Sequence, residues 1–277
     1  MNFLVYLPGR KENTGGHVVL HKLTKILSEL GYRVLVTQKP IFDCNCEVVD
    51  TNYVLKNEEL ENTITIYPEQ IIGNPTKSKH VCRWILYHTT NEVEDSWSEL
   101  DVKFKFVPGF TSQEITKNTL TVIDSKIDIF YNKGLGDKRA GICHINKKKY
   151  PQGEKQLEYL NSKDLGDFME NGGFAYLAEE FNKFEYFITY DDATYYSVMA
   201  ALCGCRSVIL NPDNKITPEE YRELYPVRKY GVAYGWIDLK HADLTRDLVR
   251  NHVKEYEKKS VESVINFVNF WQNKKKN

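Results

Sequence analysis

The first forty residues alternate between short apolar runs and one amphipathic stretch. Residues 3–7 are apolar, and residues 8–16 form a polar segment that contains glycine. Apolar side chains then recur at helical spacing over 19–30, before Gly31 and a second apolar run at 32–36. This pattern predicts a strand, a loop, a helix and a second strand, which is the βαβ unit of a parallel sheet.

The alternation continues through the rest of the first half. Residues 63–67 and 102–107 have the apolar, β-branched composition of strands. Residues 78–86 follow a Gly-Asn-Pro turn and are predicted as a helix, although 84–87 resembles a strand in composition. The first half is therefore predicted to be one α/β unit.

A second unit with the same alternation begins near residue 139. Its predicted strands are 139–145, 186–190 and 207–210, and its predicted helices are 175–181 and 194–203. A last helix is predicted from the helical spacing of apolar residues within 257–272, and a lysine-rich tail follows it.

Two such units predict an α/β protein with two Rossmann-like domains. We expect an N-terminal domain over 1–125, a C-terminal domain over 126–255, and a C-terminal helix with a basic tail over 256–277. Ligands of parallel α/β domains bind at the C-terminal ends of the strands, so candidate chemistry is sought in the loops that follow strands.

Composition narrows the class of protein. The chain has 277 residues, of which 42% are hydrophobic and 27% charged, as in folded globular domains. Lys and Arg number 37 against 38 Asp and Glu, and this balance argues against a nucleic-acid partner. No apolar run is long enough to span a bilayer, and the N-terminus lacks the basic region of a signal peptide. Peripheral membrane contact stays compatible with these features.

The six cysteines do not predict disulfides. They are sparse for a disulfide scaffold, and no Asn-x-Ser/Thr acceptor site is present, so a reducing, cytoplasmic location is expected. The pairs Cys44/Cys46 and Cys203/Cys205 could supply four thiolates to zinc. Their spacing differs from the usual Cys-x2-4-Cys knuckle, so no metal site is predicted.

Several common catalytic motifs are missing. The chain has no P-loop, no Gly-x-Gly-x-x-Gly after the first strand, no Gly-x-Ser-x-Gly elbow and no His-Glu-x-x-His. It also lacks an Asp-x-Asp sequence, with which one large class of sugar transferases holds a metal and a nucleotide diphosphate.

The loop before the first helix is the first candidate. Gly15 and Gly16 would let the backbone approach a ligand, and a helix start favours anionic or oxygen-rich groups. His17 would then face the cleft and is a candidate catalytic base. A plain turn with a surface histidine is the alternative.

The second candidate follows the predicted strand 63–67. Glu69 falls where catalytic groups of α/β proteins are found, and its carboxylate is a candidate general base for an acceptor hydroxyl. Asn74 and His88 are candidate cleft or acceptor residues near it. The alternatives are a loop carboxylate and a simple turn. Arg83 is interpreted as a structural ion-pair partner rather than a ligand.

In the second half, the segment after strand 186–190 is the candidate donor site. Asp191 and Asp192 could bind sugar or ribose hydroxyls, and Thr194 could cap the next helix, whose first N–H groups, with Tyr195, would face phosphate oxygens. An acidic helix start is also an ordinary feature of helices.

Lysines follow the first strand of the second unit. Lys147 and Lys149 are candidates to neutralise a diphosphate leaving group. A solvated run of lysines is an equally good interpretation of the same residues.

Three blocks of the chain resemble glycosyltransferases of the GT-B fold. Residues 15–34, with Gly-Gly-His and Leu-Gly-Tyr-Arg-Val, are similar to the start of many such enzymes. Residues 67–84, with Tyr-Pro-Glu, Gly-Asn-Pro and Arg-Trp, resemble a group of bacterial and viral glycosyltransferase-like sequences. Residues 187–205 resemble the donor-binding block, but Val198, Met199 and Ala200 stand where a Glu is usual.

The resemblance implies two domains that face a central cleft. The C-terminal domain would bind a nucleotide-diphosphate sugar, the N-terminal domain a glycan, lipid-linked or small-molecule acceptor, and the last helix would cross back to the first domain. No metal and no cofactor besides the donor substrate would be needed. The alternatives are a non-catalytic nucleotide- or sugar-binding module on this fold, and a nucleotide-sugar epimerase.

Overall fold

The computed structural model describes residues 1–9, 14–87, 89–110, 116–136, 139–145, 161–210 and 216–275. The chain divides into two compact units. Unit 1 contains Met1–Asp124 together with Glu257–Asn277, and unit 2 contains Ser125–Tyr256. The fold is mixed α/β with one parallel sheet in each unit.

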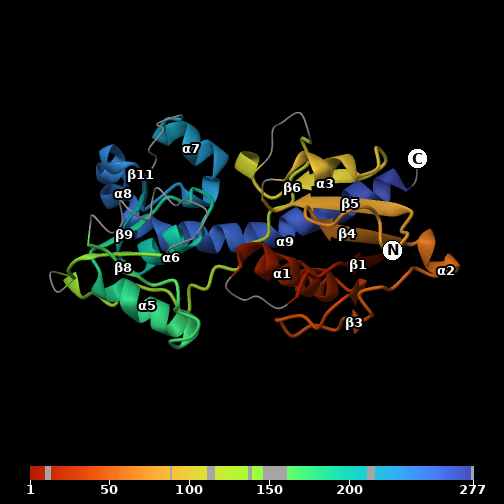
Figure 1. Cartoon of the computed structure of the whole chain (residues 1–277), viewed down its shortest axis with the longest axis horizontal. Helices are drawn as coiled ribbons and strands as arrows, with labels where there is room; N and C mark the ends of the chain where they lie inside the picture. The colour runs from red at the N-terminus through yellow and green to blue at the C-terminus, as the bar shows by residue number, and fades with distance from the viewer. Residues whose placement is uncertain are drawn as a thin grey trace. The chain divides into compact units, whose positions relative to one another are not determined.

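The sheet of unit 1 has six described strands, all of them parallel to their neighbours. They are β1 (Asn2–Val5), β2 (Arg33–Val36), β3 (Glu47–Val48), β4 (Thr63–Pro68), β5 (His80–Ile85) and β6 (Val102–Lys105). Their order across the sheet is β3-β2-β1-β4-β5-β6, and Figure 1 shows β1, β4, β5 and β6 in this sequence.

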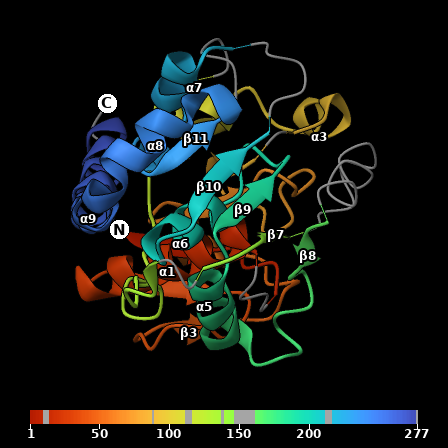
Figure 2. The same cartoon turned by 90° about the vertical axis from the view of Figure 1, so that its left-hand side faces the viewer.

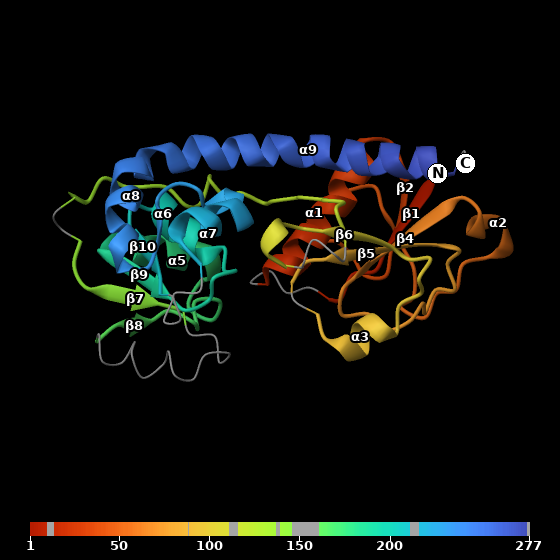
Figure 3. The ribbon, with the colours of Figure 1, turned by 90° about the horizontal axis from the view of Figure 1, so that it is seen from above.

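Helices α1 (Gly15–Glu29) and α9 (Val249–Lys274) bury apolar side chains in the core of unit 1. The stripe of α1 includes Leu20, Leu23 and Leu27, as its helical spacing predicts. The part of α9 that belongs to unit 1 adds Phe267 and Trp271, and Figure 3 shows this part alongside β1 and β2. The short helices described in this unit are α2 (Asn57–Leu60), α3 (Asn91–Asp95) and the 3-10 turn η1 (Pro108–Phe110).

The prediction of a helix over 78–86 was wrong, because this segment forms β5. Cys82 and Trp84 point into the core that α1 and α9 cover, whereas Arg83 between them is buried on the other face. Both faces of β5 are therefore covered, and a doubly buried strand lacks the polar alternation that distinguishes a strand from a helix.

The sheet of unit 2 has the described strands β7 (Ile142–His144), β8 (Lys163–Asp164), β9 (Tyr186–Thr189), β10 (Arg206–Ile209) and β11 (Val232–Tyr234). Their order is β11-β10-β9-β7-β8, and Figure 2 shows β10, β9, β7 and β8 in this sequence. The helices described in unit 2, besides the first part of α9, are α5 (Gly173–Lys183), α6 (Tyr196–Leu202), α7 (Pro218–Leu224) and α8 (Leu239–Thr245), with 3-10 turns η3 (Pro226–Arg228), η4 (Trp236–Asp238) and η5 (Arg246–Leu248).

The predicted strands and helices of unit 2 fall on β7, β9, β10, α5 and α6, with ends that differ by a few residues. β8, β11, α7 and α8 were not predicted. Within the described part of the chain, no helix combines the length and the apolar character needed to cross a bilayer.

Candidate functional site

Each sheet has one position at which the order of its strands reverses. In unit 1, β1 leads by α1 to β2 on one side, whereas β4 lies on the other side of β1. In unit 2, β7 leads to β8 on one side, whereas β9 lies on the other. Ligands of open parallel sheets bind at the C-terminal ends of the strands at such a reversal. Glu69 follows β4 directly and Asp191 follows β9 by two residues, so both lie at these positions.

Glu69 is buried at the reversal of unit 1. The residue is 4% exposed, and its Oε2 accepts a hydrogen bond from the Leu86 N–H, just beyond β5, at 3.0 Å. Loss of hydration raises the pKa of the Glu69 carboxyl from 4.5 to about 7, and two backbone N–H groups oppose this shift only in part. A carboxyl with such a pKa exchanges protons near neutral pH, as a general base requires.

The start of α1 lies close to the same point. A Cβ placed on Gly16 would meet the Leu86 side chain at 3.7 Å, so Gly16 and Glu69 both neighbour Leu86. Neither Gly15 nor Gly16 has the positive φ that requires glycine, and the space beside the Gly15 Cα is open. Glycine at these two positions leaves room beside the helix start.

His17 is turned toward its own loop. Its Nδ1 lies 3.1 Å from the Gly9 carbonyl oxygen, and the buried His21 one turn later also approaches this oxygen, at 3.4 Å. No hydrogen bond joins His17 to Glu69 among the described residues.

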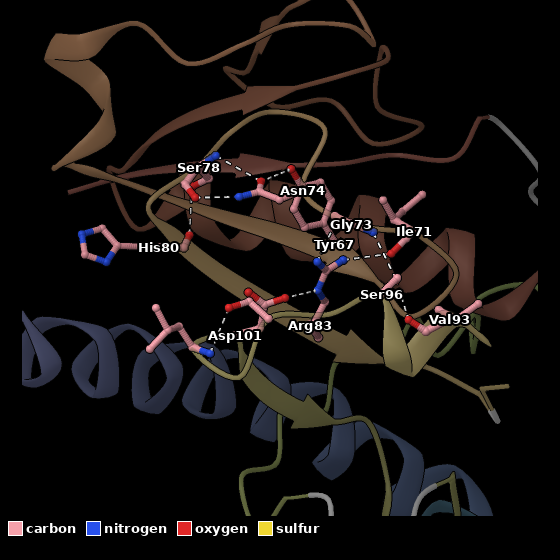
Figure 4. Close-up of polar contacts among 12 residues, drawn as sticks. Tyr67, Ile71, Gly73, Asn74, Ser78, His80, Arg83, Val93, Ser96 and Asp101 are labelled. Atoms are coloured by element: carbon pink, nitrogen blue, oxygen red, sulfur yellow. Dashed lines mark hydrogen bonds and ion pairs between the residues drawn. The ribbon is translucent and has the colours of Figure 1, made fainter. Parts of the chain in front are cut away.

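Asn74 organises the loop between β4 and β5. Its Oδ1 accepts hydrogen bonds from the Tyr67 hydroxyl at 3.0 Å and the Ser78 N–H at 3.1 Å, and its Nδ2 donates to the Ser78 carbonyl at 2.8 Å. Figure 4 shows the side chain directed at Ser78 and Tyr67. These bonds use both ends of the amide, so the geometry gives Asn74 a structural role in the loop.

Arg83 forms a buried ion pair, which confirms its structural interpretation. The residue is 1% exposed; its Nε donates to Asp101 Oδ2 at 2.7 Å, and its Nη atoms donate to the carbonyls of Ile71 and Gly73. The guanidinium also lies over the Tyr67 ring (Figure 4). These contacts fix the loop that begins at Glu69.

In unit 2, Asp191 forms a tight turn after β9. Its N–H donates to Thr189 Oγ1 at 3.0 Å, and its Oδ1 accepts from the Ala193 N–H at 3.0 Å. Thr194 Oγ1 accepts from the Tyr196 N–H at 3.4 Å, so Thr194 bonds the first residue of α6 although Tyr195 is the N-cap residue. Asp191 and Thr194 are buried.

Two residues that the sequence did not indicate hold this turn in place. The Tyr221 hydroxyl on α7 donates to the Asp192 carbonyl at 2.8 Å. The buried Arg228 guanidinium on η3 donates to the carbonyls of Ala193 and Thr194. Their bonds are with backbone carbonyls distant in sequence, and no local motif signals such contacts.

Three predicted site residues, Lys147, Lys149 and His88, lie outside the described residues. All six cysteines are free thiols. Within the described part of the chain, no three or more His, Cys, Asp or Glu side chains gather where they could hold a metal ion.

Several solved structures are similar to this chain. An O-GlcNAc transferase from Thermobaculum terrenum matches 98% of this chain and 67% of its own, with 10% identity and a TM-score of 0.49. An alpha-glucosyltransferase in complex with UDP and DNA matches 95% of both chains, with 11% identity and a TM-score of 0.45. WaaG, a glycosyltransferase involved in lipopolysaccharide biosynthesis, matches 96% of this chain and 95% of its own, with 9% identity and a TM-score of 0.39.

These structures belong to the class of enzyme that the sequence resembles, the glycosyltransferases. Their identities and TM-scores transfer no residue role to this chain. No protein-family model matches the chain, and no curated protein matches it.

Replacement of Arg83 tests whether the loop after β4 depends on it. Arg83→Met leaves the Asp101 carboxylate buried without its cation, so we expect a loss of about 3–5 kcal/mol in the free energy of unfolding, measured by urea denaturation. Lys79→Ala is the matched control, because it breaks the exposed pair with Glu61. An equal effect of the two substitutions would contradict the structural role of Arg83.

The raised pKa of Glu69 predicts a pH dependence of stability. Between pH 4.5 and 7 the unfolded carboxyl ionises while the folded one keeps its proton, so stability falls as pH rises. The pKa shift from 4.5 to about 7 corresponds to about 3 kcal/mol. The amide of Glu69→Gln can still accept the hydrogen bond from the Leu86 N–H but does not ionise. Relative to the wild type, its free energy of unfolding should therefore rise by about this amount between pH 4.5 and 8.

Urea denaturation at several pH values measures this difference. Glu61→Gln, just before β4, is the control: Lys79 lowers the pKa of the Glu61 carboxyl, so this variant should keep the fall in stability. If Glu69→Gln shows the same fall as the wild type, the carboxyl of Glu69 titrates normally.

Proposed function

We propose that the protein is a glycosyltransferase that moves a sugar from a nucleotide-diphosphate donor to an acceptor hydroxyl. The observation that carries the proposal is the buried Glu69 carboxyl, with a pKa of about 7, at the strand-order reversal of unit 1. The presence of a second parallel sheet with its own reversal supports separate sites for two substrates. The resemblance of the sequence supports the choice of a sugar nucleotide as one of them.

In the proposed reaction, Glu69 is the general base. Its ionised carboxylate takes the proton of the acceptor hydroxyl as this oxygen attacks the anomeric carbon of the donor. The bond from that carbon to the diphosphate breaks, and the electron pair leaves with the nucleoside diphosphate. The attack occurs on the face opposite to the leaving group, so the proposed reaction inverts the anomeric configuration.

The donor is assigned to the reversal of unit 2. Asp191 and Asp192 would bind hydroxyls of the ribose or sugar, on a turn that Tyr221 and Arg228 hold rigid. Lys147 and Lys149, which follow β7 in sequence, are proposed to neutralise the negative charge of the diphosphate without a metal. Glycan, lipid-linked and small-molecule acceptors are all compatible with this assignment.

Donor binding and catalysis are tested on one pair of variants. The melting temperature of the protein is measured with UDP, GDP, CDP, TDP or ADP, each with and without EDTA. We expect one of these nucleotides to raise it, and the rise to be the same in the presence of EDTA. With the matching sugar nucleotide and an acceptor that the wild type uses, Glu69→Gln should lower kcat about 100- to 10,000-fold and keep the nucleotide shift. Glu61→Gln should retain the wild-type kcat.

Three results would count against the proposal. Absence of any nucleotide shift would exclude the donor site, and donor binding without turnover in the wild type would favour a binding module. Release of an epimerised sugar nucleotide without an acceptor would favour an epimerase.

A further inference from the structure

Lys105 is a buried lysine at the edge of the sheet that carries Glu69. It is the last residue of β6 and is 5% exposed. Its N–H donates to the Asn118 carbonyl and its own carbonyl accepts from the Leu120 N–H, each at 3.0 Å, so neighbouring chain fixes its backbone on one side. On the other side it pairs with Ile85 of β5.

The ammonium of Lys105 lacks a counterion within the described part of the chain. No ion pair and no hydrogen bond joins its side chain to another described residue. The other cations of this region have partners: Arg83 has Asp101, and Lys103 lies over the Trp97 ring at 5.6 Å. The Lys105 Nζ is not among the fully buried side-chain nitrogens that lack a partner, so the stem of the lysine is buried while its ammonium reaches solvent, where it can bind an anion.

The register of three strands relates Lys105 to Glu69. Pro68 of β4 pairs with Trp84, so Glu69 follows at the level of Ile85, which pairs with Lys105. Two strand spacings therefore separate the backbones of Glu69 and Lys105 by about 10 Å. No ion pair joins the Lys105 ammonium to the Glu69 carboxylate among the described residues.

We propose that Lys105 binds a phosphate or carboxylate group of the acceptor, so that the acceptor is an anionic sugar or polyol. The inference rests on the proposed function, in which Glu69 takes the proton of the acceptor hydroxyl. A single acceptor that carries both a hydroxyl and an anionic group spans the separation between the two residues. Lys105 is then a residue of the acceptor site that selects charged over neutral acceptors.

The test measures anion binding and needs no turnover. Calorimetry compares glucose 6-phosphate, glucuronate and glucose in the presence of a saturating amount of whichever nucleoside diphosphate raises the melting temperature, so that phosphate probes are kept from the donor site. We expect the wild type to bind at least one of the two anions at least tenfold more tightly than glucose. Lys105→Met should lose at least tenfold of that affinity, and should melt near the wild-type temperature because methionine keeps the packing of the buried stem.

Lys103→Met is the matched control, two residues earlier on β6, and it should bind the anion as the wild type does. Lys105→Gln replaces Lys105→Met if the methionine variant does not fold. The inference is overturned if the wild type binds neither anion more tightly than glucose. It is also overturned if the folded Lys105 variant binds the preferred anion with the wild-type affinity. Lysine-dependent anion binding in a protein that binds no nucleotide would uphold this site and refute the proposed transfer reaction.

Discussion

The bonds of the buried Arg83 guanidinium are the interactions on which the loop after β4 in unit 1 depends. β4 and β5 are neighbouring parallel strands, and their connection, residues 69–79, is described throughout and contains no helix. Parallel neighbours usually need a helical crossover, so this loop needs other support. Arg83 supplies it by binding the carbonyls of Ile71 and Gly73 while Asp101 balances its charge. Because the loop begins at Glu69, these bonds also keep that carboxyl beside Leu86.

Burial acts differently on three charged residues that lie on or directly after three neighbouring strands, β4, β5 and β6. Arg83 donates hydrogen bonds to a carboxylate and two carbonyls, so its charge is balanced inside the protein. Among the described residues, Glu69 has only backbone N–H donors, and its pKa rises toward neutrality. Lys105 has no partner among the described residues. The first arrangement stabilises the fold, whereas in the proposed reaction the other two side chains act on the substrate, one as a proton acceptor and one as a cation.

The parts of the fold that follow one simple periodicity could be predicted from the sequence. α1 has a regular apolar stripe, and the polar residues that follow β4 and β9 lie at the two strand-order reversals. β5 could not be recognised, because both of its faces are buried and one of them carries Arg83.

Contacts between residues far apart in sequence account for most of what was missed. Arg228 and Tyr221 hold the turn after β9 through backbone carbonyls, which leave no pattern in the sequence. Lys105 reads as one lysine of an ordinary strand, and only the structure shows that it is buried. The burial of Glu69 is likewise tertiary: the sequence indicates that it follows a strand, but its raised pKa depends on the elements packed around it.

The most direct test of Glu69 as a proton acceptor is an NMR titration of its side-chain carboxyl carbon. The protein is labelled with carbon-13 at glutamate, and Glu69→Gln assigns the signal by its absence. A titration midpoint near 7 is the result we predict, from the pKa of about 7 that burial gives this carboxyl. A midpoint near 4.5, the value of an ordinary glutamate, would mean that the carboxyl is hydrated and would contradict its role as the base.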